Sequence, residues 1–269
     1  MHITHFIFIL SESISLNRLI LSATKDSACV KDLAQSSFLY EGVFDMNYVW
    51  QWDFVWEILP RLIKHGVVIT VELTTISVCI GTVIGLLVAL LRISKYKPLQ
   101  WLGAAYTDFF RGTPLLVQIM IIHYALPVVF NYTPVVWVSA IGALSINSGA
   151  YVAEIFRAGI QSIDKGQMEA GRSLGMTYGQ AMRYIVLPQA FKISIPPLGN
   201  EFIALLKDSS LVMIIGLQEL MGTSKLIVGR QPRVLETYLT AAFLYLIMTM
   251  SISRLVRYGE RRLKAGDHS

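Results

Sequence analysis

Three long segments of this sequence contain no charged residue. They are Leu73–Leu91, Val135–Ala153 and Thr237–Ser253. A helix needs roughly 20 consecutive apolar residues to cross the ~30 Å hydrocarbon layer of a membrane. The rest of the chain has the same character, since 54% of its 269 residues are hydrophobic, only 15% are charged and the mean hydropathy is +0.54. The three segments therefore predict three transmembrane helices in a membrane protein.

Two further segments are apolar but interrupted. In Leu99–Leu126, two charged residues lie near the middle, and we expect Leu115–Leu126 with a preceding turn or two to form the centre of a fourth span. The segment Ile185–Leu217 predicts one helix with breaks or two short helices. Its interruptions are Lys192, Pro196-Pro197, Asn200-Glu201 and Lys207-Asp208. The sequence thus predicts an all-α polytopic membrane protein with five transmembrane helices.

Lysine and arginine residues collect on one side of the predicted spans. With the N-terminus outside, that side receives the basic residues of 92–97, 157–192 and 254–264, whereas the 127–134 connection has none. Cytoplasmic loops are enriched in lysine and arginine, so we expect the 157–192 loop and the C-terminus to be cytoplasmic. The net charge of +5 follows from this asymmetry and suits contact with membrane lipid, and no nucleic-acid partner is expected.

The chain begins differently from the rest. Residues 1–45 are Ser-rich, and their apolar run Phe6–Leu10 is too short to span a membrane and has no basic region before it, unlike a signal peptide. We expect an unstructured segment, or an extension outside the protein proper if Met46 is the start. Several tryptophans favour an interfacial segment over 46–65. A transmembrane domain over 66–258, with a cytoplasmic loop at 159–190, and a cytoplasmic tail at 259–269 complete the predicted organisation.

Motifs for enzymatic chemistry are absent from the sequence. The histidines are scattered without metal-ligand spacing, and the two cysteines, Cys29 and Cys79, predict no disulfide. The chain has neither a phosphate-binding Gly-x-x-x-x-Gly-Lys-Ser/Thr loop nor a Gly-x-Ser-x-Gly nucleophile motif. We therefore expect no metal, no cofactor and no catalytic residue, and any ATP that the system uses would be hydrolysed by a partner chain.

The polar stretch between the third and fourth apolar regions is the most informative part of the chain. Helix formers over Ser162–Met182 are broken by Gly166, Gly175 and Gly179, which predicts two short helices joined at a glycine with positive φ. Glu169, Ala170 and Gly171 put one acidic and two small residues on successive positions, and small side chains let a helix approach another surface closely, which favours docking. An ordinary solvated connector is the alternative.

The same stretch resembles the EAA loop of permease subunits in binding-protein-dependent ABC importers. The matching positions are Glu169, Ala170, Gly171, Gly175, Ile185, Leu187 and Pro188. At Gly171 the family more often has a second alanine. Four other stretches are similar to the polar amino acid branch of these permeases, whose members carry histidine, glutamine, arginine or opines. They are 111–118, 154–163, 166–167 and 206–212, so the resemblance covers roughly residues 60 to 260.

The resemblance implies a type I ABC importer permease fold in a bacterial inner membrane. Its implied partners are a cytosolic ABC ATPase dimer, a second permease subunit that is identical or homologous, and a periplasmic or lipid-anchored amino-acid-binding protein. The loop would couple ATP hydrolysis to transport through Glu169, Ala170, Gly171, Leu174 and Gly175. The amino acid itself is not fixed by this chain, and a permease for another small solute, or a channel or secondary transporter, is the alternative.

Polar residues inside apolar segments are candidates for the substrate path, because a charge near mid-bilayer is costly and usually faces protein, water or a substrate. The candidates are Glu154, Asn200, Glu201, Lys207 and Asp208. An amino acid carries an ammonium and a carboxylate, so groups of both signs suit it. The structural alternatives are a helix-end pair between Glu154 and Arg157, and a helix break at Lys207-Asp208. We expect Arg111 to be structural, pairing with an acidic group of the other subunit or with lipid head groups.

Overall fold

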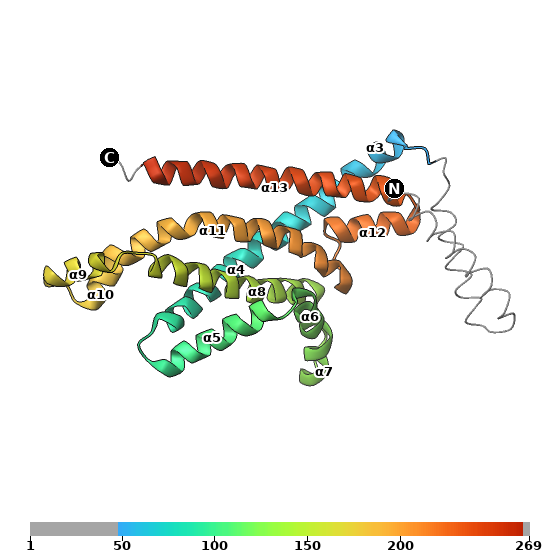
Figure 1. Ribbon diagram of the computed structural model, residues 1–269. Coiled ribbons are helices and arrows are strands. Elements are labelled where there is room, and N and C mark those ends of the chain that lie inside the picture. Colours follow the sequence, from blue (N-terminus) through green and yellow to red (C-terminus); the bar gives the residue numbers. More distant parts are fainter. Residues whose placement is uncertain (1–47, 266–269) are drawn as a thin grey trace, which may run out of the picture. The chain divides into compact units, whose positions relative to one another are not determined.

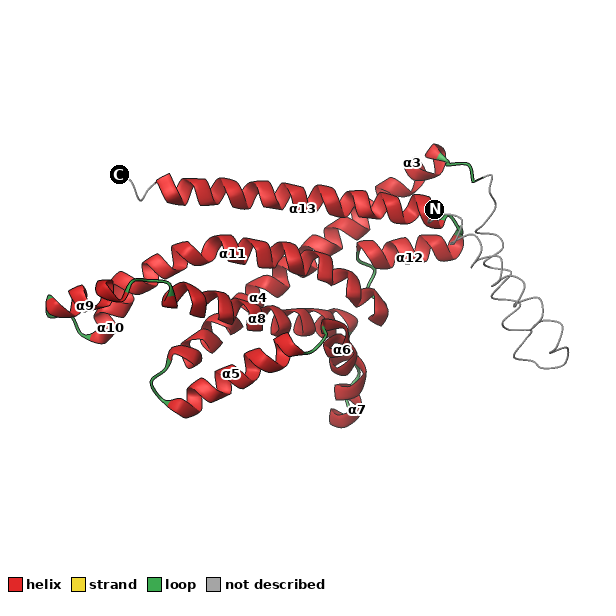
Figure 2. Ribbon diagram, viewed as in Figure 1, coloured by secondary structure: helices red, strands yellow, loops and turns green. Residues whose placement is uncertain are grey.

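Helices form every regular element of the part of the chain that the structure describes (Figure 2). The computed structural model describes the backbone of residues 48–265 and the side chains of 48–261. The expectations for residues 1–45 and the final residues of the predicted tail lie outside the described range. Over the described residues the all-α prediction is confirmed. The helices belong to one unit, Gln51–Ser269.

Three helical stretches are long and apolar enough to cross a membrane. The first is 42 residues long and joins α3 (Trp52–Arg61), the π-helical turn η1 (Leu62–Val67) and α4 (Val68–Ile93). The other two are α8 (Val136–Gln161) and α13 (Val234–Ala265). They contain the three charge-free segments of the sequence, except for Val135, which caps the start of α8. Helix α13 continues beyond residue 258, where we placed the start of the tail.

Two bent helix pairs supply up to two further spans, so the described residues carry three to five. The first pair bends by 103° and the second by 46°. The elements of the first are α5 (Lys97–Gly112), α6 (Leu115–Met120), the π-helical turn η2 (Ile121–Ala125) and α7 (Leu126–Phe130). Those of the second are α10 (Tyr178–Ala181), the π-helical turn η3 (Met182–Val186), α11 (Leu187–Asp208), the 3₁₀ turn η4 (Ser209–Ile215) and α12 (Leu220–Arg230).

The second pair is interrupted at the last of the positions that the sequence suggested. Helix α11 continues through Pro196 and Pro197 and ends at Asp208, and after η4 the chain turns at Gly216, whose φ is +89°. Proline lacks an amide donor, but a transmembrane helix tolerates it where neighbouring helices hold the backbone. The neighbour here is α13, which runs beside α11 (Figure 1) and packs its Val256 directly on the backbone of Gly199.

Among the described helices, α4 and α8 have the most extensive contact, and they cross near their middles (Figure 1). A Cβ atom added to Gly85 would lie 2.6 Å from the Cβ of Val152 and 2.9 Å from the carbonyl oxygen of Gly149. A Cβ atom on Gly81 would lie 3.0 Å from the carbonyl oxygen of Ser145. Small residues allow membrane helices to approach this closely, and dispersion contacts between the backbones then hold the pair.

Replacing Gly85 by leucine should separate α4 from α8. The new side chain would meet the backbone of Gly149, which cannot rotate away, and overpacking costs about 1–3 kcal/mol. We expect a lower melting temperature for the detergent-solubilised Gly85→Leu protein, measured by size-exclusion recovery after heating. Gly142→Leu is the matched control, because a Cβ atom at Gly142 on α8 would meet nothing within 4 Å. Equal melting temperatures for the two variants would contradict the close-packing argument.

Candidate functional site

The loop between α8 and α11 is a compact pair of helices. Helix α9 (Lys165–Ser173) begins at Asp164, whose Oδ1 accepts a 2.8 Å hydrogen bond from the amide of Gly166. It ends in a Schellman turn, where the amide of Met176 donates to the carbonyl of Gly171 and the amide of Gly175 to that of Arg172, each at 3.1 Å. Gly175 has a φ of +87°. The prediction of two short helices joined at a positive-φ glycine is confirmed.

The second helix of the loop, α10, begins with a capping box. The amide of Gln180 donates to Oγ1 of Thr177 at 3.3 Å, and the amide of Thr177 donates to Oε1 of Gln180 at 2.8 Å. These reciprocal bonds satisfy two amides that a helix start otherwise leaves unpaired. Helix α10 then passes through η3 into α11 with no residue between them. The loop is thus joined to a membrane helix without a flexible linker.

The motif residues of the loop divide into an outer and an inner group. The outer group is exposed and consists of Glu169, Ala170, Leu174 and Gly175, with 85% of Leu174 accessible. Gly171 is buried, because a Cβ atom there would lie 2.7 Å from Cδ1 of Ile185 and 3.2 Å from the Cβ of Ala181. Gly171 is therefore small in order to fit its own loop, whereas we expected it on the docking face.

The remaining motif residues mark the start of α11. Leu187 is half-buried and Pro188 occupies the first turn of the helix, as the sequence predicted. Sequence reasoning missed a contact between the loop and another part of the chain. The Nζ atom of Lys95 lies 4.7 Å from the ring centroid of Tyr178 on α10. This cation–π contact ties the α4–α5 turn to the loop.

A second group of polar residues surrounds the carboxylate of Glu154 on α8. Arg157 donates from Nε to Oε2 at 3.0 Å and from Nη2 to Oε1. The Nη1 atom of Arg92 on α4 lies 3.5 Å from Oε2, and that of Arg111 on α5 lies 3.9 Å from it. The expected pair of Glu154 with Arg157 is thus present within a larger cluster. Arg111 finds its acidic partner in its own chain, where it also lies over the ring of Tyr151.

Next to Arg111, buried amide side chains form the hydrogen bonds that shape the bend between α5 and α6. The carbonyl of Phe110 accepts from Nε2 of Gln118 at 2.9 Å and from Nδ2 of Asn147 at 3.2 Å. Asn147 also donates to Oε1 of Gln118 at 3.0 Å. Both amide side chains are buried. Sequence reasoning missed Asn147, although an asparagine inside the uncharged segment 135–153 is itself a signal of a buried polar partner.

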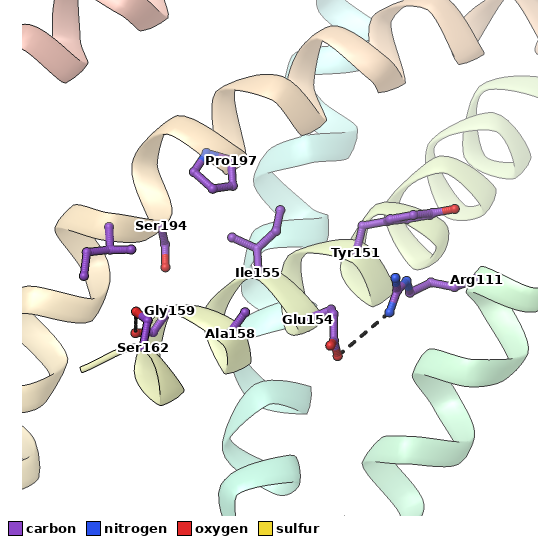
Figure 3. Close-up of a pocket in the computed structure, with 10 residues that line it drawn as sticks. Arg111, Tyr151, Glu154, Ile155, Ala158, Gly159, Ser162, Ser194 and Pro197 are labelled. Carbon is purple, nitrogen blue, oxygen red and sulfur yellow. Dashed lines mark hydrogen bonds and ion pairs between the residues drawn. The ribbon is translucent and has the colours of Figure 1, made fainter. Parts of the chain in front are cut away.

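Arg111, Tyr151 and Glu154 lie at one end of a pocket of about 380 Å³ between α5, α8 and α11 (Figure 3). Two elements provide the rest of its lining. Helix α8 contributes Ile155, Ala158 and Gly159 and the residue that follows its end, Ser162, while α11 contributes Ile193, Ser194 and Pro197. The pocket is therefore charged at one end and lined by small and aliphatic groups along its length.

Only one of the five substrate-path candidates lines the pocket in Figure 3. Glu154 lines the pocket, while Glu201 on α11 is half-buried and interacts electrostatically with Arg111 and Asp208. Asn200 is exposed on the same helix, as are Lys207 and Asp208 in its last turn before η4. Glu154 and Glu201 thus both interact electrostatically with Arg111. Among the described residues, no group of three or more histidine, cysteine or acidic side chains could hold a metal ion.

Comparison with known proteins agrees with this architecture. The family model described as "Binding-protein-dependent transport system inner membrane component" matches residues 81–265. The L-cystine transport system permease protein TcyB of Bacillus subtilis (strain 168) is 43% identical over 79% of this chain and 91% of its own length. The glutamine transport system permease protein GlnP of Escherichia coli (strain K12) is 38% identical over 79% and 97%.

Solved structures show the same fold. A crystal structure of an amino acid ABC transporter with histidines superposes with a TM-score of 0.76 and 41% identity, covering 80% of this chain and all of that chain. An inward-facing MetNI methionine ABC transporter superposes with a TM-score of 0.61 and 23% identity over 74% and 96%. The second likeness concerns the fold alone.

The fit between Gly171 and Ile185 is testable with a compensating pair. Gly171→Leu should loosen the loop, since the new side chain occupies the space of Ile185, and Ile185→Ala in the same chain should restore part of the packing. The measurement is the rate of trypsin cleavage at the exposed residues Arg172 and Arg183. Gly179→Leu is the control, because a Cβ atom there meets nothing within 4 Å. If trypsin cuts the double variant as fast as it cuts Gly171→Leu, residues 171 and 185 do not pack against each other as the structure shows.

Proposed function

The chain belongs to the family of binding-protein-dependent transport system inner membrane components, and from this premise we propose that it forms the translocation path of an ATP-driven amino-acid importer. The observation that carries the proposal is its identity of about 40%, over nearly the whole length of the relatives, to permeases for cystine and glutamine. As a transport subunit, the chain works with a separate ATPase and a second permease subunit. A periplasmic or lipid-anchored binding protein would deliver the amino acid.

The exposed residues Glu169, Ala170, Leu174 and Gly175 form the proposed contact with the ATPase. Leu174 supports this assignment most strongly, because a large apolar side chain stands fully out from a hydrogen-bonded turn. Such a side chain gains free energy when it enters a pocket of a partner. Gly171 and Ile185 would support the contact from inside the loop, and Leu187 and Pro188 from the start of α11.

The loop is built to pass a displacement to the membrane. Because α10, η3 and α11 follow one another without a linker, a rigid-body movement of the loop would also move α11. Helix α11 supplies Ile193, Ser194 and Pro197 to the pocket in Figure 3. Closure of an ATPase dimer against the loops would therefore change the shape of this pocket, which is the step that alternating access requires.

The charged end of the pocket suits an amino acid. A guanidinium group binds a carboxylate through paired hydrogen bonds, and Arg111 makes the longest of the three contacts to Glu154, at 3.9 Å. Arg111 would therefore be able to hold the substrate carboxylate while Glu154 and Glu201 face its ammonium group. Asn200, Lys207 and Asp208 lie further from the cytoplasmic loop along α11 and would provide earlier contacts for an imported substrate.

Site-directed crosslinking would test the contact with the ATPase. Leu174→Cys, in a chain with Cys29 and Cys79 replaced by serine, should form an adduct with a co-expressed amino-acid-importer ATPase, and its yield should change with ATP. Val128→Cys on α7 is the control, because Val128 is 82% exposed but lies outside the loop, so its cysteine should react with a maleimide and form no adduct with the ATPase. A folded Leu174→Cys chain that reacts with a soluble maleimide yet forms no adduct with a competent ATPase would contradict the proposed contact.

Arg111→Gln should reduce ATP-driven uptake of the amino acid in proteoliposomes. Loss of a charge-assisted hydrogen bond to the substrate corresponds to about a tenfold or larger decrease. Glu154 keeps Arg92 and Arg157 as partners, so the variant should insert and assemble normally. Arg254→Gln on α13 is the control. Undiminished uptake by Arg111→Gln would remove Arg111 from the substrate path, and uptake of only a different solute class would favour the alternative permease.

A further inference from the structure

A second pocket, of about 390 Å³, has a distinctly basic lining. It shares no residue with the pocket in Figure 3, and its lining includes three basic side chains and no acidic one. The lining residues are Arg92, Lys97, Gln100, Trp101, Ala104, Arg157 and Gln161. Neither the proposed transport path nor the loop contact uses this pocket.

The charge around this pocket is unbalanced. Arg92 and Arg157 share the single carboxylate of Glu154 with Arg111. Lys97 makes no ion pair with any residue in the described part of the chain. Three arginines thus share one carboxylate in a partly buried region, where uncompensated charge is costly, and the exposed Lys97 adds a fourth positive charge beside them. The region is consequently short of negative charge.

The pocket lies where three helices end at one level. Helix α4 ends at Ile93, α5 begins at Lys97 and α8 ends at Gln161. The start of α5 adds positive character, because the N-terminal end of a helix dipole is positive. Beside it, Trp101 is 82% exposed and Leu102 is 61% exposed. Exposed tryptophan next to lysine at the end of a membrane helix is typical of the boundary between head groups and acyl chains.

We propose that this pocket binds the phosphate of an anionic phospholipid. Lys97, Arg92 and Arg157 supply the positive charge that a phosphodiester requires, and Gln100 and Gln161 supply further polar groups. The exposed side chains of Trp101 and Leu102 lie where an acyl chain would pass. A free inorganic phosphate offers the same charge to the pocket but gains nothing from Trp101 and Leu102. The lipid is therefore the ligand that fits both the basic lining and the exposed apolar side chains beside it.

Native mass spectrometry of the full chain in detergent would test this assignment. Phosphatidylglycerol, phosphatidylcholine and inorganic phosphate are titrated separately. We expect a phosphatidylglycerol adduct that phosphatidylcholine does not match. Lys97→Gln should weaken the adduct on the order of fivefold, the factor contributed by one basic residue near an anionic surface. Trp101→Ala should weaken the lipid adduct while leaving any binding of inorganic phosphate unchanged.

Arg254→Gln is the matched control, because it removes an exposed basic residue from α13, which lines no part of this pocket. Equal phosphatidylglycerol binding by the original chain, Lys97→Gln and Arg254→Gln would overturn the proposal. Binding of inorganic phosphate with the same dependence on Lys97 and no preference for the lipid would also overturn it, in favour of a soluble anion. Neither result depends on transport activity, so both are independent of the proposed function.

Discussion

The close approach of α4 and α8 is the contact on which the rest of the structure depends. Within a membrane, two helices gain little from excluding water, so they need surfaces that fit closely. Gly85 and Gly149 provide such surfaces. Arg92 follows Gly85 by two helical turns and Glu154 follows Gly149 by little more than one, so the glycine crossing also sets the distance between the arginine and the carboxylate. A wider crossing would leave both charges without their partner.

Glu154 in turn connects three helices and separates two pockets. Its carboxylate forms ion pairs with Arg92 on α4, Arg111 on α5 and Arg157 on α8. The hydrogen bonds from Arg157 and the ion pairs with Arg92 and Arg111 together offset the desolvation of this half-buried carboxylate. The residue is therefore structural in one respect and a candidate for substrate contact in another. Substitution of Glu154 would remove the structural ion pairs and the candidate substrate contact together. Substitution of Arg111 tests the substrate path, and substitution of Lys97 tests the basic pocket, while Glu154 stays in place.

Features that depend on neighbouring residues in the chain were predictable from the sequence. The charge-free segments predicted α4, α8 and α13, and the glycine pattern predicted the two helices that meet at Gly175. Features set by distant contacts were not. Pro196 predicts a helix break until α13 is known to pack beside α11, and Gly171 looks like a docking residue until Ile185 is seen against it. The partner of Arg111 lies 43 positions away, at Glu154, and no local pattern relates the two.

The π-helical turn η3 joins the loop to α11. A π turn contains one residue more than the α-helical ladder around it needs. Each residue of an α-helix corresponds to a rotation of about 100°. A π turn is wider than an α turn, so it spreads about the same total rotation over one more residue. Loss of one residue from Met182–Val186 would therefore leave a regular α-helix between α10 and α11 with α9 and Leu174 facing nearly the same way. The turn thus carries an extra residue at the base of the loop without turning the loop away from a partner below the membrane.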